Sequence, residues 1–164
     1  MDKVKVFIAF LLCFLLAFSF FSCSGNQTNP YSHCEYNLSL PNNFYKIENP
    51  QFDVSFTNGK EYVAILRISY AAAIKSGIPE TYTADEFGLY WLKECDRSCD
   101  MLKFEDVDYC DYVETVNDEE FFYLAAFYRS KHAYFVVLFS SSNKDAETSK
   151  DVFLRYAADA YFTD

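Results

Sequence analysis

The strongest constraint on the fold is a run of three strand-like segments, residues 104–116, 120–129 and 133–140, each rich in aromatic and aliphatic side chains. The links Asn117-Asp118-Glu119 and Ser130-Lys131-His132 are polar and have the length of tight turns. Strands joined by such short turns pair with their sequence neighbours, so these three predict an antiparallel meander. Residues 121–128 and 134–139 are apolar at both odd and even positions, which predicts strands covered on both faces.

Earlier strands have the same character. Residues 35–40 alternate polar and apolar side chains and end at the turn Pro41-Asn42-Asn43. Residues 52–56 alternate again, and Asn58-Gly59 is a strong hairpin signal. The strand that follows, 61–71, is apolar on both faces, which predicts a central position in the sheet.

Two helices are predicted. The sequence Thr83-Ala84-Asp85-Glu86 reads as a capping box that opens a helix ending near Arg97. Gly88 weakens this helix by about 1 kcal/mol relative to alanine. The segment 75–82 before it reads as a loop. Caps at 141–144 open a final helix, whose buried stripe is Val152, Phe153, Tyr156, Ala157, Ala160 and Tyr161.

The order of elements is therefore β-β-β-α-β-β-β-α. An order of this kind predicts the α+β class, here an antiparallel sheet of about six strands with two helices packed on it.

The chain opens like an exported protein. Lys3 and Lys5 precede the apolar run 6–21, which only Ser19 interrupts with a polar side chain. A basic start and a short apolar core are typical of a signal peptide, and about 16 residues are short for a bilayer span of about 20. We expect a signal peptide at 1–22, a lipidated tether at 23–34 and one folded domain at 35–164.

Cys23 lies where the apolar run ends and a polar stretch begins. The sequence Phe20-Phe21-Ser22-Cys23 resembles a lipobox, although Phe21 replaces the usual small residue. It predicts acylation of Cys23, with palmitate-type chains that anchor an extracytoplasmic protein at the cell membrane or cell surface. Two alternatives stay open. One is cleavage after Ser19 with Cys23 left free, and the other is an uncleaved N-terminal anchor.

The chain is acidic, with a formal net charge of −10. Loss of residues 1–22 would make it one unit more negative, because that segment holds two lysines and one aspartate. Phosphates and anionic headgroups repel such a surface. We therefore expect no nucleic-acid partner; contact with the membrane would run through the N-terminal lipid, and an envelope protein partner is possible on charge grounds.

Four cysteines follow Cys23: Cys34, Cys95, Cys99 and Cys110. An even set in an exported protein favours disulfides, with three possible pairings. Cys95 and Cys99 are four residues apart, which on one helix face is a poor geometry for bonding each other. We expect each to pair with Cys34 or Cys110. A four-cysteine zinc site is the alternative, but the C-x3-C spacing does not give paired C-x2-C knuckles.

Four stretches resemble the PsbP/Mog-like α/β/α sandwich domains. They are the opening "LSLPNNF", the hairpin "FDVSFTNGKEYVAILRISY", the capped helix "TADEFGLYWLKE", and the closing meander and helix "YVETVNDEEFFYLAAFYRSKHAYFVVLFSSS…DVFLRYAADAYF". The resemblance covers about residues 35–163. It implies a domain of the kind carried on bacterial lipoproteins, whose known members are binding or assembly modules.

The residues offer little catalytic chemistry. The two histidines are His33, in the tether, and His132, in a predicted turn. No serine-hydrolase, zinc-protease, P-loop or dinucleotide motif is present in the sequence. Acidic residues gather in 96–111 and suit calcium, but the EF-hand spacing is missing and a solvated acidic edge explains them. We expect no enzyme activity, no catalytic residue, no cofactor and no metal.

Aromatic side chains offer the one candidate for binding. Phe87, Tyr90 and Trp91 share the central helix at helical spacing. They read either as the buried face of that helix or as the lining of a groove for a ligand. We take Tyr90 and Trp91 as a possible binding surface. The sequence thus predicts a non-enzymatic binding or assembly module, with a ligand-capturing lipoprotein as the alternative.

Overall fold

The computed structural model describes residues 31–33 and 36–162. The predicted signal peptide, Cys23 and Cys34 lie outside the described residues. The last described part of the predicted tether, Tyr31–His33, forms strand β1, which pairs with β2, Tyr36–Leu38.

The large sheet has seven strands in the order β3-β4-β5-β9-β8-β7-β6, and every neighbouring pair is antiparallel. The strand bounds are β3 Tyr45–Ile47, β4 Val54–Thr57, β5 Glu61–Ser69, β6 Leu102–Phe104, β7 Val107–Val116, β8 Glu119–Arg129 and β9 Ala133–Ser142. A small sheet holds β1, β2 and β10, Tyr161–Phe162, in the order β1-β2-β10. The predicted α+β class and antiparallel sheet are confirmed.

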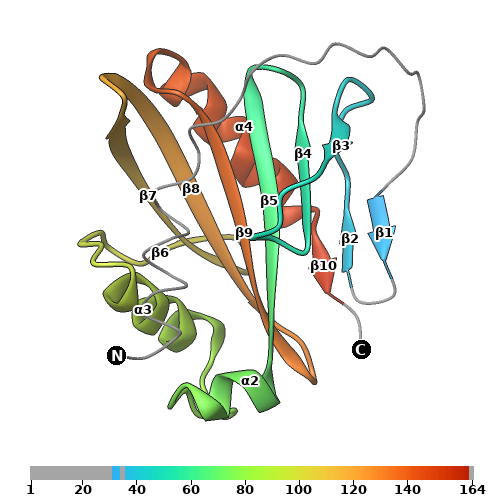
Figure 1. Ribbon diagram of the computed structural model, residues 1–164, viewed down its shortest axis with the longest axis vertical. Helices are drawn as coiled ribbons and strands as arrows, with labels where there is room; N and C mark the ends of the chain where they lie inside the picture. The colour runs from blue at the N-terminus through green and yellow to red at the C-terminus, as the bar shows by residue number, and fades with distance from the viewer. Residues whose placement is uncertain (1–30, 34–35, 163–164) are drawn as a thin grey trace.

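Three α-helices are described: α2 Tyr70–Lys75, α3 Ala84–Glu94 and α4 Ala146–Ala158, the last preceded by a 3-10 turn at Asn143–Asp145. In Figure 1, α4 runs along the sheet, while α2 and α3 lie at the lower end of the view. The predicted capping box is present, since the Glu86 carboxylate accepts the backbone N–H of Thr83 at 2.9 Å.

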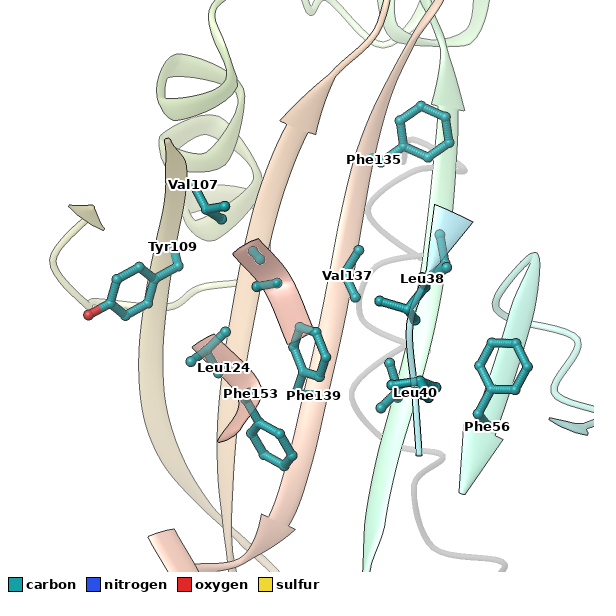
Figure 2. Packing of buried hydrophobic residues seen from close by; sticks show 14 of the residues in the cluster. Leu38, Leu40, Phe56, Val107, Tyr109, Leu124, Phe135, Val137, Phe139 and Phe153 are labelled. Carbon is teal, nitrogen blue, oxygen red and sulfur yellow. The ribbon is translucent and has the colours of Figure 1, made fainter. Parts of the chain in front are cut away.

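Side-chain alternation along the central strands builds two cores. On β9, Phe135, Val137 and Phe139 face α4 and β2, whereas Tyr134, Val136 and Leu138 face α2 and α3. Figure 2 shows the first core, in which Phe139 of β9 lies beside Phe153 of α4 with ring centroids 5.2 Å apart. The prediction that these strands are covered on both faces is confirmed.

The meander turns form as predicted. Asn117 and Asp118 both have positive φ, 50° and 66°, which is the backbone of a two-residue hairpin turn that matches strand twist. Asn58-Gly59 also closes a hairpin, between β4 and β5, with Gly59 at φ 86°.

Several boundaries differ from expectation. The predicted strand 61–71 ends at Ser69, whose hydroxyl caps the short helix α2 that sequence analysis missed. The predicted strand 104–116 is a hairpin, β6–β7, whose turn holds Glu105 at φ 52°. The helix expected to end near Arg97 ends at Glu94. The sequence predicted Tyr161 in the buried stripe of the final helix. The Tyr161 side chain is instead 55% exposed and belongs to β10.

Candidate functional site

A pocket of about 380 Å³ lies on the α3 side of the large sheet. This volume falls in the range of small-molecule sites. Its walls come from three places: the segment before β4, the end of β5 with helix α2, and helix α3. The lining residues are Pro50, Gln51, Phe52, Asp53, Leu66, Arg67, Ile68, Ala72, Ser76, Ile78, Phe87, Tyr90 and Trp91.

Helix α3 provides the aromatic wall. Phe87, Tyr90 and Trp91 are three and four residues apart and therefore share one face of the helix. Phe87 is fully buried and stacks on Tyr134 with ring centroids 4.4 Å apart. Trp91 packs edge-on against Phe127 at 5.7 Å. These side chains thus belong to the buried face of the helix, as one of the two interpretations predicted, and they also line the pocket. That the pocket binds a ligand stays a prediction.

Tyr90 connects α3 to α2. It is half-buried, and its hydroxyl donates a hydrogen bond to the carbonyl of Ser76 at 3.2 Å. Burial raises the pKa of the Tyr90 phenol, and the nearby Glu94 carboxylate adds to the effect. The phenol therefore stays protonated as a donor at neutral pH.

The wall opposite α3 is set by the segment leading into β4. The Phe52 ring meets the Tyr62 ring edge-on at 6.4 Å, and the Phe52 N–H donates to the Asn49 carbonyl at 3.2 Å. Asp53 is tied to β5, because one of its carboxylate oxygens accepts the backbone N–H of Arg67 at 2.6 Å. These bonds fix the segment against the sheet.

Trp91 is the residue of special interest in the pocket. Its side chain is 4% exposed, and its indole Nε1 is buried without a hydrogen-bond partner. Buried polar groups are almost always paired, so such an exception requires an explanation.

The structure thus brings together both residues of the predicted binding surface, Tyr90 and Trp91. It adds Phe52, Ile68 and Ala72, which sequence analysis missed. No local pattern marks these three, because they reach the pocket only through the pairing of β4 with β5 and the turn into α2.

The three cysteines that the structure describes are not among the residues that line the pocket. Cys95, Cys99 and Cys110 are free thiols in this structure, so no disulfide joins them. The Cys99 and Cys110 thiols nevertheless lie close enough to influence each other's pKa. Burial raises the pKa of the Cys95 thiol to about 12 and also raises that of Cys110.

The remaining candidate residues from the sequence do not come together in a site within the described part of the chain. Within residues 31–33 and 36–162, no group of three or more histidine, cysteine or acidic side chains could hold a metal ion. Two acidic residues of the 96–111 stretch make ion pairs, Asp108 with Lys103 at 3.7 Å and Asp111 with Lys150 at 2.8 Å. His132 is exposed in the β8–β9 turn, as expected. Over the described residues, no helix is both long and apolar enough to cross a bilayer.

Comparison with known proteins identifies structures with a similar fold. No family model matches the sequence, and neither does any curated protein. Among solved structures, cyanobacterial PsbP (CyanoP) from Synechocystis is similar, with a TM-score of 0.52 and 14% identity over 86% of this chain and 97% of that one. The fold is PsbP-like. The family resemblance drawn from the sequence is confirmed at the level of the fold.

A second similar structure is a protein from Bacteroides thetaiotaomicron, with a TM-score of 0.55 and 14% identity. The match covers 77% of this chain but 44% of that protein, so the chain spans less than half of its length. At this identity the likeness concerns the fold, and function must be argued from the pocket itself.

Proposed function

We propose that this chain is an extracytoplasmic, lipid-anchored binding module, not an enzyme, that holds a small and largely apolar ligand in the pocket between α3, α2 and β5. The observation that supports this most is the pocket itself, about 380 Å³ in volume and walled by Phe52, Ile68 and Phe87. Ligand sites in proteins are mostly apolar concavities with a few polar groups.

The lining favours binding over catalysis. Its described residues include no histidine and no cysteine, and their one carboxylate, on Asp53, is held by the Arg67 N–H. The hydroxyl of Ser76 donates to the Ala72 carbonyl at 3.1 Å, so it is not positioned by a base as a nucleophile would be.

The lipid anchor is proposed from Cys23 and the apolar run before it. A pair of acyl chains would hold the domain at the outer face of a membrane. There it would meet apolar molecules of the envelope, which are the ligands that such a pocket suits.

Ligand binding can be tested with N-phenyl-1-naphthylamine, a small apolar probe whose fluorescence rises in apolar surroundings. Two neighbouring alanines of α2 give a matched pair of variants, since both are exposed but only Ala72 lines the pocket. Saturable fluorescence is expected with the native protein and with Ala71→Phe, and weaker binding with Ala72→Phe. Absence of saturable binding, or equal binding by both variants, would contradict a ligand in this pocket.

A further inference from the structure

The mouth and the floor of the pocket differ in chemistry. Pro50, Asp53 and Ala72 line the pocket and are exposed to solvent, so they lie at its mouth. Phe87 and Trp91 are buried and form its floor. Asp53 is the only charged residue among the exposed ones of the lining. A ligand with its apolar body on the floor therefore has its other end beside a carboxylate.

The Asp53 carboxylate is held on the pocket side of the sheet. The side chain of the next residue, Val54, enters the core that faces α4. Because successive side chains of extended chain point to opposite faces, Asp53 points to the α3 side, where the pocket lies. Its Oδ2 accepts the backbone N–H of Arg67 at 2.6 Å. Within the described residues its other oxygen, Oδ1, has no hydrogen bond or ion pair, so it is available to a ligand.

The lining contains one cationic residue, Arg67, whose side chain leaves on the other face of β5. Leu66 and Ile68 pack against the core on the α3 side, whereas Ile65 belongs to the core on the α4 side. The alternation along the strand then directs the Arg67 side chain to the α4 side, and its backbone borders the pocket. No cationic side chain of the lining thus accompanies the Asp53 carboxylate on the pocket side.

We propose that the ligand is an amphipathic amine, with an apolar body on the aromatic floor and a protonated ammonium beside the Asp53 carboxylate. This inference rests on the proposed function, because it specifies the ligand of that pocket. An ammonium at the mouth keeps part of its hydration, so it avoids the large cost of a fully buried charge. An anionic group would meet the like charge of Asp53, and the net charge of −10 on the chain would repel it as well.

Two probes of nearly the same shape separate charge from apolar contact. At neutral pH 1-naphthylmethylamine ends in an ammonium, whereas 1-naphthalenemethanol ends in a neutral hydroxyl. Their affinities are measured by displacement of N-phenyl-1-naphthylamine from the native protein and two variants. Asp53→Asn removes the charge and keeps an oxygen that can accept the Arg67 N–H. Glu80→Gln is the matched control, because Glu80 is exposed and lies outside the lining.

The native protein and Glu80→Gln are expected to bind the amine about two- to fivefold more tightly than the alcohol, as one partly exposed ion pair allows. Asp53→Asn is expected to lose this preference and to keep its affinity for the alcohol. In the native protein the preference is also expected to disappear at about 1 M sodium chloride, because salt screens exposed charges. This salt dependence is the second test if Asp53→Asn fails to fold.

The outcomes separate this inference from the proposed function. Equal affinity of the native protein for the two probes, or an amine preference that persists in Asp53→Asn or in 1 M salt, would overturn the ammonium at Asp53 and leave the apolar site standing. If N-phenyl-1-naphthylamine itself does not bind saturably, the proposed function fails, and this inference with it.

Discussion

At the scale of single residues, burial controls how the cysteine thiols titrate. The Cys95 side chain is 3% exposed, and burial raises its thiol pKa to about 12. In an unfolded chain the thiol would have a pKa of about 8.5. The unfolded state therefore releases this proton first as the pH rises, and stability is lost between about pH 8.5 and pH 12.

This predicts a pH-dependent difference between the native protein and Cys95→Ala under reducing conditions. Between pH 7.5 and pH 10, the native protein is expected to lose about 2 kcal/mol more unfolding free energy than the variant. Urea unfolding at both pH values measures it. Buried tyrosines, whose pKa values are also raised, leave a residual slope in both proteins. Identical slopes would show that the Cys95 thiol does not contribute.

Cys99 and Cys110 form the second prediction at this scale. Their thiols lie close enough to interact, whereas the sequence left open whether Cys99 pairs with Cys34 or with Cys110. In an oxidising compartment we expect these two to form the disulfide. Peptide mapping without reduction is expected to recover the peptide containing Cys99 linked to that containing Cys110. A Cys95–Cys99 link, or free thiols throughout, would contradict this pairing.

At the scale of elements, the approach of α3 to β8 depends on Gly88. A Cβ built at this position would lie 2.5 Å from the Met101 Cε and 2.8 Å from a ring carbon of Phe127. Sequence reasoning treated this glycine as a weakness of the helix, but the structure shows that it permits close packing. Alanine would gain about 1 kcal/mol in helix propensity and lose about 1–3 kcal/mol to overpacking.

Gly88→Ala is therefore expected to lower the unfolding free energy by about 1 kcal/mol and the Tm by about 3 °C. Leu89→Ala on the same helix is the control, because Leu89 is 52% exposed and its removal should change the stability by no more than about 0.5 kcal/mol. Thermal unfolding followed by circular dichroism measures both. A Gly88→Ala variant more stable than the native protein would show that Met101 and Phe127 move aside without cost.

The sequence predicted elements correctly where a short local motif is itself what forms the turn or the helix end. Asn58-Gly59 forms its hairpin and Thr83-Glu86 its capping box, because both depend on neighbouring residues. The helix α2 was missed because six residues are too few for propensity to decide, so packing on the sheet fixes them. The turn at Glu105 was missed because a glutamate at positive φ is uncommon.

The residues of the candidate site divide in the same way, into those set by local sequence and those set by tertiary packing. Tyr90 and Trp91 were found from helical spacing on one element. Phe52 and Ile68 come from separate elements, and sequence spacing contains no information on how close they lie in space. The unpaired indole N–H could not be predicted, since it depends on every neighbour of Trp91.

At the scale of the whole molecule, both faces of the large sheet are occupied, by α4 on one side and by α2 and α3 on the other (Figure 1). The proposed ligand pocket is built from residues 50–91 of the domain, whereas the proposed anchor is Cys23, so the two proposals predict properties that can be removed separately. Cys23→Ser is therefore expected to abolish membrane anchoring and to leave probe binding unchanged.

Intact mass of the protein from native membranes tests the anchor. A chain that begins at Cys23 and carries acyl-chain mass is expected, and Cys23→Ser should lack that mass. An unlipidated chain beginning at Phe20, or one that retains Met1, would contradict lipid anchoring while leaving the pocket unaffected.

The most direct test of the pocket uses the single tryptophan. In a ¹H–¹⁵N correlation spectrum of the labelled protein, the Trp91 indole N–H gives one isolated cross-peak. Titration with N-phenyl-1-naphthylamine is expected to shift this peak saturably, with the same midpoint as the rise in the fluorescence of the probe. A cross-peak that stays in place while the probe is bound would place the ligand elsewhere and contradict the pocket as the site.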